Sequence, residues 1–207
     1  MRKSTLSWAV LLACLCLTSC APVIVGRTPQ PAAPEEWTFS LNAGYPLLTP
    51  YADLNAGPTQ VTRPHPVNLL IARGVGGNTE LNGTFSISLT PALRLGGKTL
   101  LVGGTVPMAV DYGVSLPFNI VFDAGLLFSY PQPGVEPYGA LRGLVTNVAS
   151  LPGLAGALTV GADIPTGSGN FFVEVTAATT TFAGREYYYV PVPPIGLTIV
   201  PALGYRF

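Results

Sequence analysis

The sequence predicts an all-β chain that closes into an up-and-down antiparallel barrel of about eight to ten strands. Apolar and polar residues alternate along most of the chain after the first twenty residues, and no later segment shows a helical period. The 24 glycines and 21 prolines among 207 residues also argue against a helical bundle. Only 10% of the residues are charged and 48% are hydrophobic. This composition excludes a disordered chain and is unusual for a soluble domain, in which about 25% of residues are charged.

The first residues have the organisation of an export signal. Arg2 and Lys3 precede an apolar stretch over residues 6–17, which is shorter than the ~20 residues that a membrane-spanning helix needs. The stretch ends in Leu17-Thr18-Ser19-Cys20, which resembles a bacterial lipobox. The resemblance implies a lipoprotein signal peptide over residues 1–19 and acylation of Cys20. The alternative is an ordinary signal peptide that is cut elsewhere, with Cys20 incidental.

The cysteine count agrees with the lipobox. Cys14 and Cys16 would leave with the signal peptide, so Cys20 would be the only cysteine of the mature chain and no intrachain disulfide could form. Residues 20–36 contain four prolines and predict a lipidated, Pro-rich tether, extended and mobile. The folded domain is therefore expected over residues 37–207.

Ten segments have the period of a β-strand. The alternation is clearest over residues 108–118, where Met108, Val110 and Tyr112 share one parity with the later apolar residues. Glycine-rich turns separate several neighbouring segments. The predicted strands are 37–46, 66–74, 80–88, 92–101, 106–117, 120–130, 136–146, 154–164, 170–182 and 195–207.

The polar face of these strands consists mainly of Gly, Ala, Ser and Thr, with too few Lys and Glu residues for a surface in bulk water. Such a pattern favours a transmembrane barrel, in which the apolar face meets lipid and the polar face lines the interior. Four positive and five negative side chains fall on the polar parity, so they can neutralise one another inside. These predicted barrel-interior charges are Glu80, Arg94, Lys98, Asp111, Asp123, Arg142, Asp163, Glu174 and Arg206. A network that only stabilises the barrel is favoured over a conducting path, because barrels of this size are largely filled by side chains.

The end of the chain carries a second resemblance. Leu203, Tyr205 and Phe207 place an apolar residue at every second position before a terminal aromatic residue. This pattern resembles the C-terminal strand signal of small bacterial outer-membrane β-barrel proteins of the OmpA/OmpX size class. The resemblance implies recognition by the barrel-assembly machinery. Most such barrels are not lipoproteins, and Pro201 falls inside the last predicted strand, where a β-bulge is expected.

Residues that could carry chemistry are few. His65 is the only histidine, and no serine or acid can be matched to it by a motif. We therefore predict no catalytic activity, no cofactor and no metal site, although a hydrolase that uses His65 at the barrel rim is an alternative. The net charge of zero indicates no nucleic-acid partner.

Together these patterns predict a lipid-anchored outer-membrane β-barrel with a structural, interaction or narrow-channel role. Its expected partners are the bilayer and the barrel-assembly and lipoprotein-processing machineries, while the oligomeric state is not predicted. The alternative is a periplasmic lipoprotein whose soluble, lipocalin-like barrel binds an apolar ligand.

Overall fold

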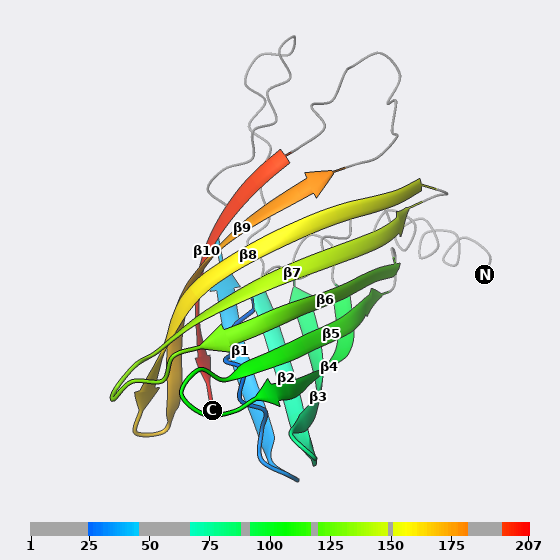
Figure 1. The fold of residues 1–207 in the computed structure, drawn as a ribbon. Coiled ribbons are helices and arrows are strands. Elements are labelled where there is room, and N and C mark those ends of the chain that lie inside the picture. Colours follow the sequence, from blue (N-terminus) through cyan, green and yellow to red (C-terminus); the bar gives the residue numbers. More distant parts are fainter. Residues whose placement is uncertain (1–24, 46–66, 88–91, 117–119, 149–150, 182–195) are drawn as a thin grey trace, which may run out of the picture.

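The computed structural model is a closed barrel of antiparallel strands (Figure 1). It describes residues 25–45, 67–87, 92–116, 120–148, 151–181 and 196–207. The strands are β1 (Trp37–Gly44), β2 (Val67–Gly76), β3 (Thr79–Ile87), β4 (Ala92–Val102), β5 (Met108–Leu116), β6 (Ile120–Ser129), β7 (Glu136–Val148), β8 (Leu151–Thr166), β9 (Gly169–Thr181) and β10 (Gly196–Arg206). Each strand pairs with its neighbours in sequence, and β1 pairs with β10 to close the barrel. Within the described part of the chain, no helix is long and apolar enough to cross a membrane.

The all-β, closed, up-and-down prediction is confirmed, and the strand number is ten. Most strand ends lie within two residues of the predicted positions. The largest difference is β8 (Leu151–Thr166), which extends beyond the predicted 154–164 because glycine and proline at its ends break the alternation without breaking the pairing with β7 and β9.

Four short connections, over residues 77–78, 103–107, 130–135 and 167–168, lie at one end of the barrel, which we call the turn end, together with the start of β1 and the C-terminus (Figure 1). The turn between β2 and β3 needs left-handed backbone at Gly77 and Asn78, whose φ values are 60° and 63°. Glycine adopts this conformation without steric cost, and asparagine tolerates it. At the opposite end, β1 and β9 end and β2 and β10 begin. Residues 46–66 and 182–195 lie outside the described residues.

The bulge expected at Pro201 is absent. Pro201 pairs with Val175 of β9 in an uninterrupted register. On the other side, its carbonyl accepts a hydrogen bond from the Tyr45 backbone N–H (2.9 Å), one residue after β1 ends. The missing N–H of the proline therefore falls where the β1–β10 ladder stops, so the strand needs no extra residue to accommodate it.

The two faces of the barrel differ in polarity. Outward side chains are largely apolar and exposed, as in Leu81 and Phe122, of which 55% and 59% are exposed. Inward side chains include many buried polar and charged groups, such as Asn68 and Thr176. This is the reverse of a water-soluble barrel and the arrangement of a barrel that meets lipid.

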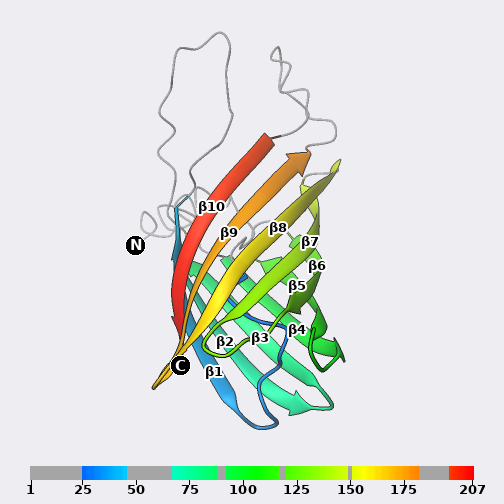
Figure 2. The same cartoon turned by 60° about the vertical axis from the view of Figure 1, so that its left-hand side comes forward.

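Residues 25–32, which we call the luminal segment, lie inside the barrel, where they form the dark blue coil of Figure 2. Residues 25–29 are buried. The interpretation of this stretch as part of a mobile tether was therefore wrong. Proline content predicts an extended backbone. It does not show whether side chains of distant strands bind that backbone and keep it in place.

Candidate functional site: the barrel lumen

All nine side chains predicted for the interior lie on the inner face of the wall. Eight of them are buried, with at most 6% of each residue exposed. Arg206 lies near the turn end and is half-buried. Strand parity places them there, because residues two apart along a strand share a face. Each needs a partner, because an unpaired charge buried in the lumen is strongly unfavourable.

Four of these charges form a cluster, the wall cluster, made of Arg94, Asp111, Asp123 and Arg142 on four consecutive strands from β4 to β7. Arg94 donates to both carboxylate oxygens of Asp123, at 2.8 and 2.7 Å. Arg142 donates to Asp123 at 3.0 Å and also to Asp111. Arg94 donates further to Asn82 on β3 at 2.9 Å and to Asp111 at 3.3 Å. Because the two guanidinium groups share two carboxylates, the cluster joins four strands across this side of the lumen.

Two further wall pairs lie nearer the turn end. Lys98 Nζ is 3.3 Å from a Glu80 oxygen. Arg206 forms an ion pair with Asp163, which also accepts a 2.7 Å hydrogen bond from Asn170. Of the nine predicted interior charges, Glu174 on β9 is the exception to this pairing, because no ion pair of this residue is found among the described residues.

Glu174 is satisfied by the luminal segment. The backbone N–H groups of Val25 and Gly26 donate to its two oxygens at 2.8 and 2.9 Å. The Tyr138 hydroxyl donates to one of these oxygens at 2.7 Å. A carboxylate that accepts charge-assisted hydrogen bonds is held firmly, so Glu174 fixes the inner end of the segment.

Arg27 brings a cation into the lumen. Its guanidinium donates to Glu80 at 3.1 Å and forms an ion pair with Asp111. Lys98 reinforces this region by donating to the backbone carbonyls of Thr28 (3.0 Å) and Gln30 (2.7 Å). The wall alone carries one more negative than positive side chain in the predicted set, and Arg27 supplies the missing positive charge.

Packing also fits the segment to the wall. Val25 is buried in an apolar cluster with Leu127, Tyr138 and Ala140. Gly26 has φ +57°, and a Cβ atom at this position would lie 2.8 Å from the Phe172 ring. Glycine is therefore required here both for the backbone conformation and for the space.

After the luminal segment, residues 33–36 leave the lumen beside β2. The Glu35 N–H donates to the Gly74 carbonyl (2.9 Å), and the Gly74 N–H donates to the Glu36 carbonyl (3.0 Å). A Cβ atom on Gly74 would lie 2.0 Å from the Ala33 carbonyl oxygen, so only glycine allows this approach. Outside the lumen, Arg73 forms an exposed ion pair with Glu35 and lies 5.4 Å from the Trp37 ring centroid.

A polar vestibule of about 240 Å³ opens at the mouth beside the segment. Charged groups of both signs line it, namely Arg27, Glu36, Glu80, Lys98, Glu136 and Arg206. Part of the luminal segment forms its wall, so the space ends where the segment fills the lumen.

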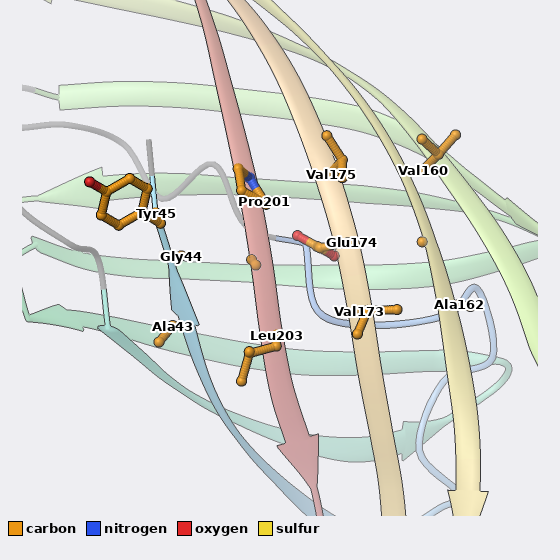
Figure 3. A pocket seen from close by; sticks show the side chains of 12 residues that line it. Ala43, Gly44, Tyr45, Val160, Ala162, Val173, Glu174, Val175, Pro201 and Leu203 are labelled. Atoms are coloured by element: carbon orange, nitrogen blue, oxygen red, sulfur yellow. The ribbon is translucent and has the colours of Figure 1, made fainter. Parts of the chain in front are cut away.

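A second hollow, of about 780 Å³, lies on the outer surface where β10 meets β1 and β9 (Figure 3). Val173 and Val175 are exposed here, whereas Glu174 between them is buried and points to the interior (Figure 3). Small residues such as Ala43 and Ala162 leave room between the bulkier side chains. This hollow faces outward and is separate from the lumen.

The charged and occupied interior contradicts the lipocalin-like alternative, because an apolar ligand would have to displace paired charges. Among the described residues, no group of three or more His, Cys, Asp or Glu side chains could hold a metal ion. Cys20 and His65 lie outside the described residues.

The predicted C-terminal signal lies on the outward face of β10 at the turn end. Leu203 and Phe207 are exposed, by 55% and 59%. The ring of Phe207 lies 5.9 Å from that of Tyr205 and 6.4 Å from that of Phe39 on β1. Recognition of these residues by assembly machinery stays a prediction.

The residues that the sequence analysis missed are those of the luminal segment. Arg27, Gly26 and Val25 precede the first strand and were counted with the tether. One signal was available, since the predicted interior set was short of one positive charge and Arg27 is the basic residue nearest before the first strand.

No protein-family model matches the chain, and no curated protein matches it in sequence. Among solved structures, the attachment invasion locus protein Ail of Yersinia pestis is similar at a TM-score of 0.32 and 13% identity, covering 84% of this chain and all (100%) of that one. The outer membrane protein OprG of Pseudomonas aeruginosa is similar at a TM-score of 0.28 and 14% identity, covering 86% of this chain and 98% of that one. Both TM-scores are low, so the function must be inferred from the geometry of this chain.

Proposed function

We propose that this chain is an integral outer-membrane β-barrel with a structural or interaction role, whose lumen is closed by its own luminal segment. The observation that carries the proposal is the inversion of polarity, with an exposed apolar exterior and a buried, ion-paired interior. Exposed apolar surface costs about 25 cal/mol per Å² in water, and a lipid environment removes that cost. A closed barrel also leaves no strand edge unpaired in the bilayer.

The orientation follows from the two ends of the barrel. Outer-membrane barrels have short turns on the periplasmic side and longer loops outside. We therefore assign the end with the tight turns, Trp37 and Phe207 to the periplasm. The opposite end, where β1 and β9 end and β2 and β10 begin, then faces the cell surface, and an interaction role would reside there.

A narrow-channel role requires an open path, and the contacts of the luminal segment oppose one. The segment occupies the space that the wall cluster leaves, and it is anchored at both Glu174 and Glu80. In this arrangement the barrel is closed. A non-enzymatic role is also part of the proposal. We expect the wild type to hydrolyse neither ester nor peptide substrates, and any activity that is detected should be equal in a His65→Ala variant.

Membrane insertion is tested by gel mobility in SDS of the extracted protein, boiled and unboiled. A closed membrane barrel resists SDS until it is heated, so the expected result is a band shift together with resistance to alkaline extraction. Unchanged mobility, with a water-soluble product, would overturn the membrane assignment.

Lipid anchoring through Cys20 is a separate part of the proposal and rests on the lipobox resemblance. Cys20 precedes Val25 by five residues, which span at most about 17 Å when extended. Val25 is fixed in the lumen, so the acylated Cys20 must lie within this distance of it. The acyl chain must therefore reach lipid from that position. The test is metabolic labelling with a fatty acid, in which the wild type is expected to take up label and Cys20→Ser to take up none. Equal labelling of the two proteins would exclude this anchor, and a heat-modifiable Cys20→Ser variant would show that the barrel does not depend on it.

A further inference from the structure

The two sides of the lumen hold their charges differently. On the side of β4 to β7, Arg94, Arg142 and Asp123 of the wall cluster pair with one another within the wall, and Asp111 is the member of the cluster that also pairs with Arg27 of the luminal segment. Outside these four strands, Glu174 on β9 and Glu80 on β3 accept hydrogen bonds from the luminal segment, and Glu80 is also paired with Lys98 of the wall. Departure of the segment would therefore leave the wall cluster in place and remove donors from the opposite side.

Three carboxylates of the wall, Glu80, Asp111 and Glu174, contact the luminal segment. Glu174 would lose two backbone donors, Glu80 would lose Arg27 and the Ala32 N–H, and Asp111 would lose one of its cations. Lys98 is the cation of the described wall that donates to the segment, and it would remain 3.3 Å from Glu80. The vacated space would thus have an excess of negative charge.

Access to this space exists at the turn end. The polar vestibule of about 240 Å³ leads to the segment, and Glu36 and Glu136 add carboxylates to its lining. Charge of one sign along a narrow path raises the local concentration of the opposite ion. Once Arg27 has left with the segment, the vestibule lining keeps three carboxylates (Glu36, Glu80 and Glu136) and two cations (Lys98 and Arg206). A cation arriving from this side would therefore meet an excess of negative charge before it reaches Glu174.

We propose that the luminal segment is a removable plug, and that the lumen without it is a cation-selective path lined by Glu80, Asp111 and Glu174. The proposal rests on membrane insertion. It is tested only on protein that has already shown a heat-dependent band shift, so a failed plug test does not count against membrane insertion. The ions that would enter this path are small monovalent cations. In the closed barrel, the guanidinium of Arg27 occupies the position beside Glu80 and Asp111 that such a cation would take.

The decisive variant is Gly26→Ala, which unseats the segment and changes no charge. A Cβ atom here meets both a φ of +57° and the Phe172 ring at 2.8 Å. Its matched control is Gly77→Ala, with φ +60° in the β2–β3 turn and nothing within 4 Å of the added atom. Both substitutions strain the backbone equally, but only the first disturbs the plug.

Release of the plug is measured first, by limited trypsin digestion of the full chain in vesicles and mass determination of the products. Arg27 is buried in the wild type, so cleavage after it requires the segment to leave. We expect at least tenfold faster cleavage after Arg27 in Gly26→Ala than in the wild type or Gly77→Ala. Equal rates in the three proteins would show that the segment is not displaced from this position and would overturn the proposal.

The path is then measured by planar-bilayer recording in a KCl gradient. The wild type and Gly77→Ala should be silent, whereas Gly26→Ala should give discrete steps whose reversal potential is shifted toward that of K⁺. Adding Glu174→Gln to Gly26→Ala should reduce that shift, because one carboxylate of the path becomes neutral. A silent but trypsin-sensitive Gly26→Ala protein, or steps with no cation preference, would overturn the cation path.

Discussion

The two sides of the barrel interior achieve charge neutrality by different routes. The wall cluster joins residues of β4 to β7 that lie on adjacent strands, so closing the barrel is enough to form it. The opposite side needs residues 25–32, which precede the barrel in sequence and must enter it. The comparison shows that one side is completed by strand pairing, and the other by a segment that can in principle leave without unpairing any strand.

Asp111 is the point where the two sides meet, and replacing it should have the largest effect. It pairs with Arg27, Arg94 and Arg142. Asp111→Ala leaves three buried guanidinium groups short of a partner, and breaking a buried pair typically costs about 3–5 kcal/mol. We expect the urea midpoint for unfolding of the heat-modifiable form to fall markedly in Asp111→Ala. The midpoint of Asp111→Asn should lie between those of the wild type and Asp111→Ala. An unchanged midpoint for Asp111→Ala would contradict the role of this residue as the shared anion.

Asp123→Asn should affect the wall cluster alone. Asp123 accepts from Arg94 and Arg142, and within the described part of the chain no hydrogen bond or ion pair joins it to the luminal segment. Two buried guanidinium groups lose a charged partner, so the free energy of unfolding should fall by about 3 kcal/mol. Arg27 should nevertheless stay protected from trypsin. Rapid cleavage after Arg27 in this variant would show that the two sides are not separable.

Tyr138→Phe should have a smaller effect, on the side of the luminal segment. It removes the hydroxyl that donates to Glu174 and keeps the ring that packs with Val25. One hydrogen bond to a charged group is worth about 1.5–3 kcal/mol, and the two backbone donors of the segment remain. We expect a moderate increase in trypsin cleavage after Arg27 and no change in the strand content measured by circular dichroism. Increased protection of Arg27 would contradict the assigned contact.

Arg73→Ala should have the smallest effect. The Arg73–Glu35 pair is exposed outside the lumen, with 43% and 76% of the two side chains exposed, and such pairs contribute at most about 1 kcal/mol. The heat-modification temperature and the protection of Arg27 should stay within error of the wild type. A large loss of protection would mean that the segment is held at the rim and not at Glu174 and Glu80.

Much of the fold could be predicted from sequence, because strand periodicity is local. Asp111, Asp123 and Arg142 were placed on the inner face from parity alone, since residues two apart share a face. The partner of each charge could not be predicted, because it depends on the register between strands. Pro201 illustrates the same limit, since its effect depends on where β1 ends and not on its own neighbours in sequence.

The sequence by itself determined the strand segments, the two faces and the turn positions, all of which follow from side-chain period and from glycine and proline. Only the tertiary structure decided that ten strands close the barrel and that the stretch before them lies inside. The physical reason is distance along the chain. Arg27 meets Glu80 and Asp111 across separations of 53 and 84 residues, and no local pattern encodes a contact that exists only once the wall has closed around it.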